Sequence, residues 1–365
     1  MKMKSGFTER LRGRASGFLS KLCPLLLLVF LSCERIYEWE GDCDPHWKVK
    51  FVYDRNMKFT DAFPGAMGVG SVRLWVFDAA TGEKVLEKSA RAGADGFAKD
   101  YAMPVEELRP GRYRFVAWCG TDGNGSFVPG VMPGMWDATA RAWSVAADVL
   151  SGSDKSVRRL KPIYYGVEEF EITDEQGEHY VPISLTKDTN EINLTLQHRS
   201  RAISPADFDI AITDDNGTLL WDNTPVGEPC SYHPWHYEAG VVETAEAADD
   251  ETEAGGDTWL SCDISFPRML LGAGAGTRLS IKERQDGRVV FDFNLVKYLL
   301  LPGFHKHLLD AHNNTVSISD QDYLDREDTW QMYFFLDDSD KGGWFAFEIH
   351  ILGWVIKDEG EIGLS

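Results

Sequence analysis

Short segments in which apolar and polar residues alternate recur along most of this chain, and that pattern restricts it to a β fold. In residues 47–53, Trp47, Val49, Phe51 and Tyr53 fall on one face of such a strand. Gly and Pro residues separate the segments, so the sequence predicts an all-β protein made of antiparallel β-sandwiches. Further predicted strands cover residues 72–77, 112–118, 192–196, 208–212, 218–221, 279–282, 289–295, 315–318, 332–336 and 345–352.

Two turn sequences predict hairpins in the two halves of the chain. Residues 78–82 end in a glycine that tolerates positive φ, and residues 214–217 join the predicted strands 208–212 and 218–221. Their similarity suggests two related β domains joined near residues 186–190. Residues 137–150 predict a short helix with Asp137 as its N-cap.

The N-terminus has the organisation of a secretory signal. A basic segment precedes the apolar run 22–31, and Ser32 and Cys33 follow. The run has ten residues, too few to span a bilayer, which takes about 20. The sequence of residues 30–33 resembles a bacterial lipobox, although Phe30 stands where leucine is preferred. We expect residues 1–32 to be a lipoprotein signal peptide and Cys33 to carry the acyl chains, palmitate among them; the alternative is an ordinary secreted protein with a plain thiol at Cys33.

The expected mature chain is strongly acidic. The whole sequence carries a formal charge of −21. Residues 1–32 hold six basic side chains and one acidic one, which leaves residues 33–365 near −26. Such a surface repels phosphate backbones and argues against nucleic acid as a partner. Acidic residues are concentrated at 238–257, where large apolar side chains are scarce, and this stretch is predicted to be a disordered surface loop.

Four cysteines remain once Cys23 is removed with the signal and Cys33 is assigned to lipid. An even number of cysteines in an exported chain favours disulfides. Their distribution suggests the pairs Cys43–Cys119 and Cys230–Cys262. Four unpaired thiols are the alternative, since sequence does not determine connectivity.

No motif for catalysis is present. The sequence lacks a G-x-S-x-G elbow, a phosphate-binding loop and an H-E-x-x-H zinc helix. Two histidine groups, at 233–236 and 305–312, lie beside Pro or Gly turns, and we interpret them as ordinary loop and strand-edge histidines and not as metal ligands. Residues 337–340 hint at a calcium loop, but Ile349 stands where the twelfth-position glutamate is required. We therefore predict no enzyme activity, no metal and no cofactor.

Several landmarks, in order and spacing, resemble the FimB-type fimbrial anchor subunits of Bacteroidales. They run from the first strand to the C-terminus and so cover the expected mature chain. The departures are residues 352–354 and the acidic insert near Glu246. The landmarks are residues 42–45, 48–57, 61–63, 72–78, 113–118, 323–328 and 333–337, then Trp344 and the Gly353-Trp354 pair.

This resemblance implies two transthyretin-like β-sandwich domains in tandem, which we assign to residues 33–187 and 188–365. It also implies a surface lipoprotein that holds fimbriae to the outer membrane through Cys33 and limits their length. The acidic residues 34–44 resemble a surface-export signal of Bacteroidetes lipoproteins.

Fimbrillins of this type assemble by strand exchange, so the expected partners are fimbrillin rod subunits or other fimbrial proteins, contacted by β-strand addition. The terminal segment 344–365 is the predicted contact, and its removal is expected to leave folding largely intact. The residues expected to meet the next subunit are Trp344, Phe345, Phe347, Ile349, Ile351 and Trp354.

The sequence leaves three alternative functions. A surface glycan-binding lipoprotein would present an exposed pair or triplet of tryptophans. An accessory or tip subunit of the fimbria would share the same sandwiches. A lipid-anchored hydrolase would need a polar cleft that the sequence does not indicate.

Overall fold

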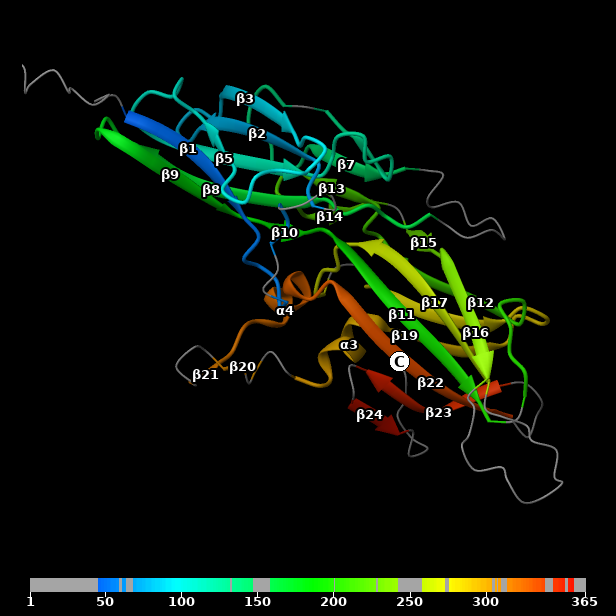
Figure 1. Cartoon of the computed structure of the whole chain (residues 1–365). Coiled ribbons are helices and arrows are strands. Elements are labelled where there is room, and N and C mark those ends of the chain that lie inside the picture. The colour runs from blue at the N-terminus through cyan, green and yellow to red at the C-terminus, as the bar shows by residue number, and fades with distance from the viewer. Residues whose placement is uncertain are drawn as a thin grey trace, which may run out of the picture. The chain divides into compact units, whose positions relative to one another are not determined.

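A computed structural model describes residues 45–58, 61–63, 68–131, 133–146, 158–199, 201–227, 229–241, 258–272, 276–303, 306, 308–309, 314–338, 344–351 and 354–357 (Figure 1). The chain divides into two compact units. The smaller unit comprises Met1–His46 and Asp174–His179, and the larger comprises Trp47–Thr173 and Tyr180–Ser365. In the smaller unit the ring nitrogen Nε2 of His179 lies 2.9 Å from the carbonyl oxygen of Glu175.

The first half of the larger unit is built around a sandwich of two sheets. One sheet has the strand order β4-β1-β9 and the other β10-β8-β5-β2-β3. Buried side chains such as Val49, Val72 and Phe115 fill the space between them. The strands are β1 (Pro45–Val52), β2 (Ser71–Asp78), β3 (Lys84–Arg91), β4 (Ala102–Pro104), β5 (Gly111–Cys119), β6 (Phe127–Pro129), β7 (Arg141–Val145), β8 (Tyr164–Ile172), β9 (Gly177–Ser184) and β10 (Thr186–Lys187).

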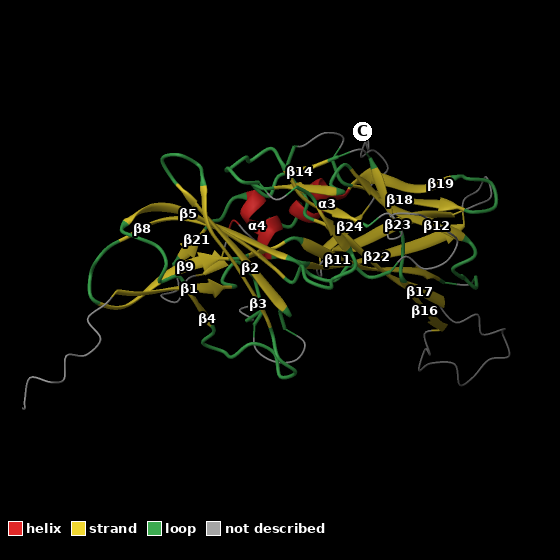
Figure 2. Cartoon of the chain, turned by 90° about the horizontal axis from the view of Figure 1, so that it is seen from above, coloured by secondary structure: helices red, strands yellow, loops and turns green. Residues whose placement is uncertain are grey.

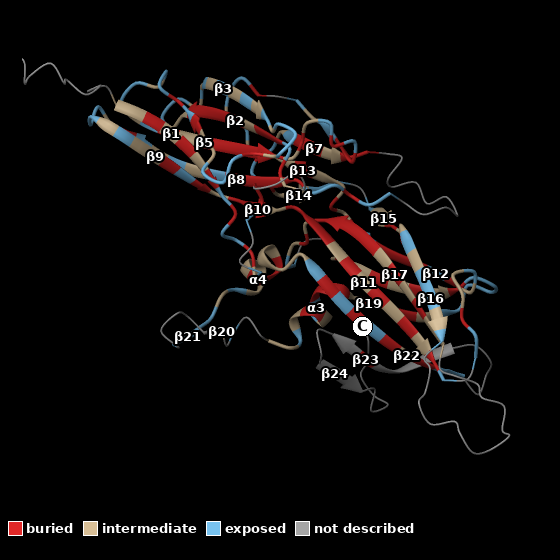
Figure 3. Ribbon diagram, viewed as in Figure 1, coloured by how far each residue is buried: buried red, intermediate tan, exposed pale blue. Residues whose placement is uncertain are grey.

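The second half forms another sandwich. Its sheets have the orders β16-β17-β11-β22-β23-β24 and β15-β12-β18-β19. Figure 3 shows buried and partly exposed residues alternating along β11, as expected of a strand with one face in the core. The strands are β11 (Thr189–His198), β12 (Phe208–Asp214), β13 (Thr218–Leu220), β14 (Pro225–Val226), β15 (Cys230–Tyr232), β16 (His236–Val241), β17 (Thr258–Pro267), β18 (Arg278–Glu283), β19 (Val289–Asn294), β20 (Leu308–Leu309), β21 (Thr315–Val316), β22 (Thr329–Asp338), β23 (Trp344–Ile351) and β24 (Trp354–Lys357).

The predicted all-β class with tandem β-sandwiches is confirmed, with one exception to antiparallel pairing. Strand β22 runs parallel to β11, in register from Glu191 with Thr329 to His198 with Leu336. Two short helices, α3 (Leu295–Leu300) and α4 (Asp320–Arg326), were not predicted (Figure 2). Ser319 is the N-cap of helix α4, and its side chain accepts a hydrogen bond from the backbone N–H of Asp322.

A further sheet joins strands from both halves of the sequence, in the order β14-β13-β7-β6. Strand β13 pairs with β7, so Trp221 just beyond it enters the cluster that contains Trp75 and Trp118.

Two predictions for this part of the chain were wrong. Residues 208–212 and 218–221 do not form a hairpin, because β12 pairs with β15 and β18. Residues 141–145 are strand β7, and Asp137 caps a turn by accepting a hydrogen bond from the N–H of Thr139.

The hairpin predicted around Gly82 is present, with β2 and β3 antiparallel and Gly82 at φ 73°. The domain boundary at residues 187 and 188 stays a prediction. Residues 1–44, including the predicted signal peptide, lie outside the described residues. Within the described residues, no helix combines the length and the apolar character needed to cross a membrane.

Candidate functional site

Strand β1, the first strand among the described residues, occupies the middle of its sheet. Strand β1 lies between β4 and β9, and its pairing with β4 is antiparallel, with Val49 opposite Met103. Val49 is fully buried, and Trp47 and Phe51 are buried beside it. The indole Nε1 of Trp47 donates a hydrogen bond to the carbonyl oxygen of Thr173 at 3.1 Å. Both backbone edges of β1 are therefore used within the chain's own sheet, and its inward face is part of the core.

The C-terminal strands form one end of the six-stranded sheet. Strand β23 lies between β22 and β24, so its two backbone edges are both paired. Strand β24 is the last strand at this end of the sheet, and no described strand pairs with its outer edge. The predicted contact segment is therefore a pair of strands, of which β24 alone offers its backbone.

Ile349 requires a correction to the predicted contact set. Its side chain is 7% exposed and belongs to the core of the second sandwich, where it is paired with Phe334. A residue in that position does not face another subunit. Removing residues 344–365 would also take this core side chain away, so that truncation is not expected to leave folding intact. Of the other five predicted contact residues the structure describes the backbone alone.

Two other edge strands of the described sheets, β3 and β9, carry features that discourage further pairing. Strand β3 bears a row of charged side chains, with the Nζ of Lys88 2.7 Å from Glu107 and the Nε of Arg91 3.0 Å from Asp122. Strand β9 contains Pro182, which has no N–H to donate. Charged residues and proline are common protections of edge strands. Strand β16 is the edge opposite β24 in the same sheet. The predicted acidic loop 238–257 is wrong at its start, because residues 238–241 are part of β16, and residues 242–257 lie outside the described residues.

The predicted Cys230–Cys262 disulfide is not formed. Both residues are free thiols, as is the fully buried Cys119. Cys262 points into the core from β17, while the Sγ of Cys230 on β15 lies 3.2 Å from the carbonyl oxygen of Asp214. The two strands belong to different sheets, which their spacing in the sequence did not indicate. Burial raises the pKa of the Cys119 and Cys262 thiols. Cys33 and Cys43 lie outside the described residues.

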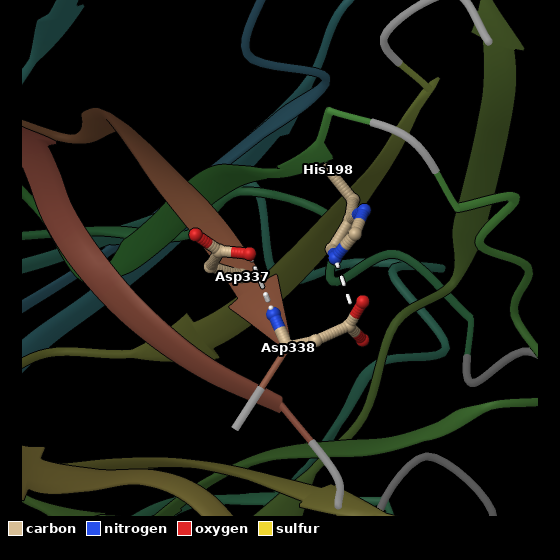
Figure 4. A group of neighbouring side chains, drawn as sticks. All are labelled: His198, Asp337 and Asp338. Carbon is tan, nitrogen blue, oxygen red and sulfur yellow. Dashed lines mark hydrogen bonds and ion pairs between the residues drawn. The ribbon is translucent and has the colours of Figure 1, made fainter. Parts of the chain in front are cut away.

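One group of three side chains with metal-binding chemistry occurs within the described residues: His198, Asp337 and Asp338 (Figure 4). Its hydrogen bonds argue against a metal. The Nδ1 of His198 accepts from the backbone N–H of Arg201 at 3.0 Å, so in the neutral ring Nε2 carries the proton. That nitrogen lies 3.8 Å from the Oδ1 of Asp338, which also receives a hydrogen bond from Arg201 at 3.2 Å. The group therefore holds the ends of β11 and β22 together.

The other predicted metal-binding possibilities have ordinary partners or are not described. The His233 ring lies 3.1 Å from the hydroxyl of Ser231, and the His236 ring lies 3.2 Å from Glu238. Residues 305, 307, 312, 339 and 340 lie outside the described residues.

A hollow of about 530 Å³ adjoins the C-terminal end of β1. None of its lining residues is a serine, cysteine or histidine, so the hollow holds no nucleophile–base pair of the kind used in acyl transfer. Of the tryptophans whose burial is described, none is exposed. The lining residues are Lys50, Phe51, Val52, Tyr53, Asp54, Asn56, Asp61, Lys99, Asp100 and Tyr101.

Residues 40–360 match the family model of the fimbrillin-A associated anchor proteins Mfa1 and Mfa2. The chain belongs to this family. The match covers both sandwiches and includes the β1 and β24 strands described above. The family is one of fimbrial anchor proteins and not of enzymes, which agrees with the absence of catalytic motifs from the sequence.

Solved structures share the fold of this family member. A candidate adhesin of Bacteroides thetaiotaomicron has 24% identity and a TM-score of 0.69, covering 87% of this chain and 99% of that one. A candidate polysaccharide-binding protein of the same organism has 28% identity and a TM-score of 0.62, with the same coverage. The fimbrial anchor protein Mfa2 of Porphyromonas gingivalis has 16% identity and a TM-score of 0.58, covering 87% of this chain and all of that one. Among proteins of curated function, no significant sequence match is found.

Proposed function

We propose that this protein is a lipid-anchored base subunit that tethers a fimbria to the outer membrane and limits its length. The observation that carries the proposal is the position of β1 in the middle of its sheet. Strand exchange requires an open position into which a partner's strand can insert. A subunit that keeps its own first strand has no such position in that sheet and so ends growth in that direction.

The tether in this proposal is Cys33. It stands 12 residues before Pro45, the first residue of β1. A segment of that length reaches at most about 40 Å when fully extended. Acyl chains on Cys33 would hold the first sandwich within that distance of the membrane surface. Stable attachment takes more than one chain, which a processed lipobox cysteine supplies.

The partner in this proposal is a β-strand of a fimbrial subunit, added at the outer edge of β24. The protected edges of β3 and β9 favour this choice, and so does the outer position of β24 in its sheet. In such an interface backbone hydrogen bonds supply affinity, while alternating side chains supply specificity. The acidic surface of this chain favours a partner whose contact segment is basic.

The first experiment compares cells that carry wild-type protein with cells that carry Cys33→Ala, and measures fimbriae on the cells and in the medium. A base anchor predicts that fimbriae move into the medium and grow longer. Fimbriae that stay on the cells while only this protein is lost would refute the anchor role and favour the accessory or tip role.

The second experiment tests the β24 edge with two proline variants, Val355→Pro and Ile356→Pro. Neighbouring residues of a strand point their N–H groups in opposite directions. One of the two prolines therefore removes a hydrogen bond to β23, and the other blocks only the outer edge. The proposal predicts that the variant with unchanged thermal stability loses fimbrial attachment. Attachment that is intact in that variant would exclude β24, and matched proline variants in β16 would then test the opposite edge.

A further inference from the structure

Asp188 is a fully buried carboxyl group at the start of the second sandwich. It lies directly after β10 and directly before β11, and its backbone N–H donates to the carbonyl oxygen of Ile163 at 2.9 Å. Its side-chain Oδ1 accepts a hydrogen bond from the Nδ2 of Asn223 at 2.8 Å. Asn223 is also buried, and it lies in the turn between β13 and β14 with a positive φ of 66°.

The same two side chains carry two buried oxygen atoms without a hydrogen bond. Among the described residues, neither Oδ2 of Asp188 nor Oδ1 of Asn223 has a partner. If Asp188 is ionised, both atoms are acceptors and neither can satisfy the other. Two buried acceptors without a hydrogen bond destabilise the folded state, because each has lost its hydrogen bonds to water.

A single proton resolves this mismatch. A carboxylic acid and a primary amide have the same forked shape, and head to head they form two hydrogen bonds in one ring. We propose that Asp188 is protonated in the folded protein and forms such an acid–amide pair with Asn223. Oδ2–H of Asp188 donates to Oδ1 of Asn223, and Nδ2–H of Asn223 donates to Oδ1 of Asp188. The proton comes from solvent as the chain folds.

The charge of Arg268 does not remove the need for this proton. Arg268 favours the ionised form of Asp188, but its guanidinium is already bound to Asp325 through contacts of 2.8 and 2.7 Å. Its remaining NH1 donates to the backbone carbonyl of Asn223 at 2.7 Å. The charge of Arg268 is thus largely balanced by Asp325, which itself disfavours a second carboxylate nearby.

The other titratable groups that interact with Asp188 are the phenols of Tyr165 and Tyr53, both neutral at ordinary pH because burial raises their pKa. Burial also raises the pKa of Asp188 to about 7, and the opposing effects of Arg268 and of the Asn223 hydrogen bond do not cancel it. In an unfolded chain the pKa of an aspartate is about 3.9.

The hydrogen bonds of this pair connect the β13–β14 turn to the segment between β10 and β11, and they depend on pH. Between about pH 4 and about pH 7 the folded chain holds a proton that the unfolded chain has lost. The contribution of Asp188 to stability is therefore complete below about pH 4 and is lost as the pH rises through about 7. At higher pH the ionised Asp188 faces the amide oxygen of Asn223.

The test uses the full chain and the variant Asp188→Asn, which replaces the acid by an amide that can make the same two hydrogen bonds without a proton. Denaturant unfolding is followed across this pH range. Relative to the variant, the folding equilibrium constant of the wild type should fall about tenfold per pH unit between about pH 4 and about pH 7. If the ratio of the wild-type folding equilibrium constant to that of Asp188→Asn does not change with pH, the proposal is overturned.

A matched control is Asp214→Asn, because Asp214 is another buried carboxyl whose pKa is raised by burial. In Asp214→Asn the contribution of Asp188 to the pH dependence of the folding equilibrium constant should be unchanged. If Asp188→Asn does not fold, carbon-13 NMR of the aspartate carboxyls in the wild type gives the answer. A carboxyl at residue 188 that is protonated at pH 6 supports the acid–amide pair, and one that is ionised at pH 5 excludes it.

Discussion

The indole ring of Trp221 meets that of Trp75 edge to face, with ring centroids 4.9 Å apart and planes at 88°. Trp221 comes from the second half of the chain and is fully buried in a cluster whose other members come mainly from the first half. Its Nε1 donates to the carbonyl oxygen of Val131 at 3.1 Å. This one side chain therefore connects two parts of the sequence that strand patterns assign to different sandwiches.

Trp221→Ala should be among the more destabilising single substitutions in this protein. Truncation of a buried tryptophan leaves a large cavity and typically costs about 3–5 kcal/mol. Urea unfolding followed by tryptophan fluorescence would measure the loss. Trp136→Ala is the matched control, since Trp136 is only partly buried and should cost much less. Equal losses in the two variants would contradict the central role of Trp221.

Asp328 should stabilise the fold in a pH-dependent way. Its carboxylate lies 2.5 Å from the Nζ of Lys187 and 2.5 Å from that of Lys58. Burial opposes its ionisation, but the two lysines outweigh burial and lower its pKa. The stabilisation is present above the unfolded pKa of about 3.9 and disappears as the pH falls through the lower pKa of the folded state.

Asp328→Asn tests this contribution. At neutral pH it should lower the free energy of unfolding by about 1.5–3 kcal/mol, the range for hydrogen bonds to charged groups. The difference from the wild type should shrink below about pH 4. Asp286→Asn is the control, because Asp286 pairs with Arg288 on the surface and such pairs contribute little. A difference between Asp328→Asn and wild type that is constant down to low pH would rule out the ion pairs as its cause.

The sequence predicted those parts of the fold in which local pattern and tertiary position agree. The alternation around Val49 identified β1 and its buried face, because a half-buried strand imposes a period of two on its own residues. The turn at Gly82 identified a hairpin, because its two strands are neighbours in both sequence and space.

The wrong predictions concern places where the tertiary position of a segment does not follow from its local sequence pattern. The turn after Asp214 has the chemistry of a hairpin, yet nothing local specifies that β13 joins β7 instead of β12. Asp137 has a side chain suited to a helix N-cap and equally suited to a turn, and it caps a turn. The parallel pairing of β11 with β22 depends on residues far apart in the chain. For the candidate site, the sequence identified the C-terminal strands but not that Ile349 faces the core.

Cys119, Cys230 and Cys262 should behave as free thiols. Denatured, unreduced protein should react with an alkylating reagent at Cys119, Cys230 and Cys262, and mass spectrometry of the peptides would show each modification. In the native protein Cys230 should react before the other two, because it alone of the three is partly exposed. A peptide pair joined through Cys230 and Cys262 would instead restore the disulfide that the sequence predicted.

Gly166 should tolerate no side chain, because residues of the facing sheet occupy the space that a Cβ atom would need. A Cβ atom built on it would come within 2.5 Å of the Cγ2 of Ile183 and 2.7 Å of the carbonyl oxygen of Ser184. Gly166→Ala should therefore force β8 away from the facing sheet and destabilise the protein by about 1–3 kcal/mol, as overpacking does. Thermal unfolding would measure this loss. Gly134→Ala, where a Cβ meets nothing within 4 Å, is the control and should be close to wild type. If Gly166→Ala is as stable as the wild type, the two sheets can separate locally without loss of core packing. The close approach of β8 to the facing sheet would then not be the reason for glycine at this position.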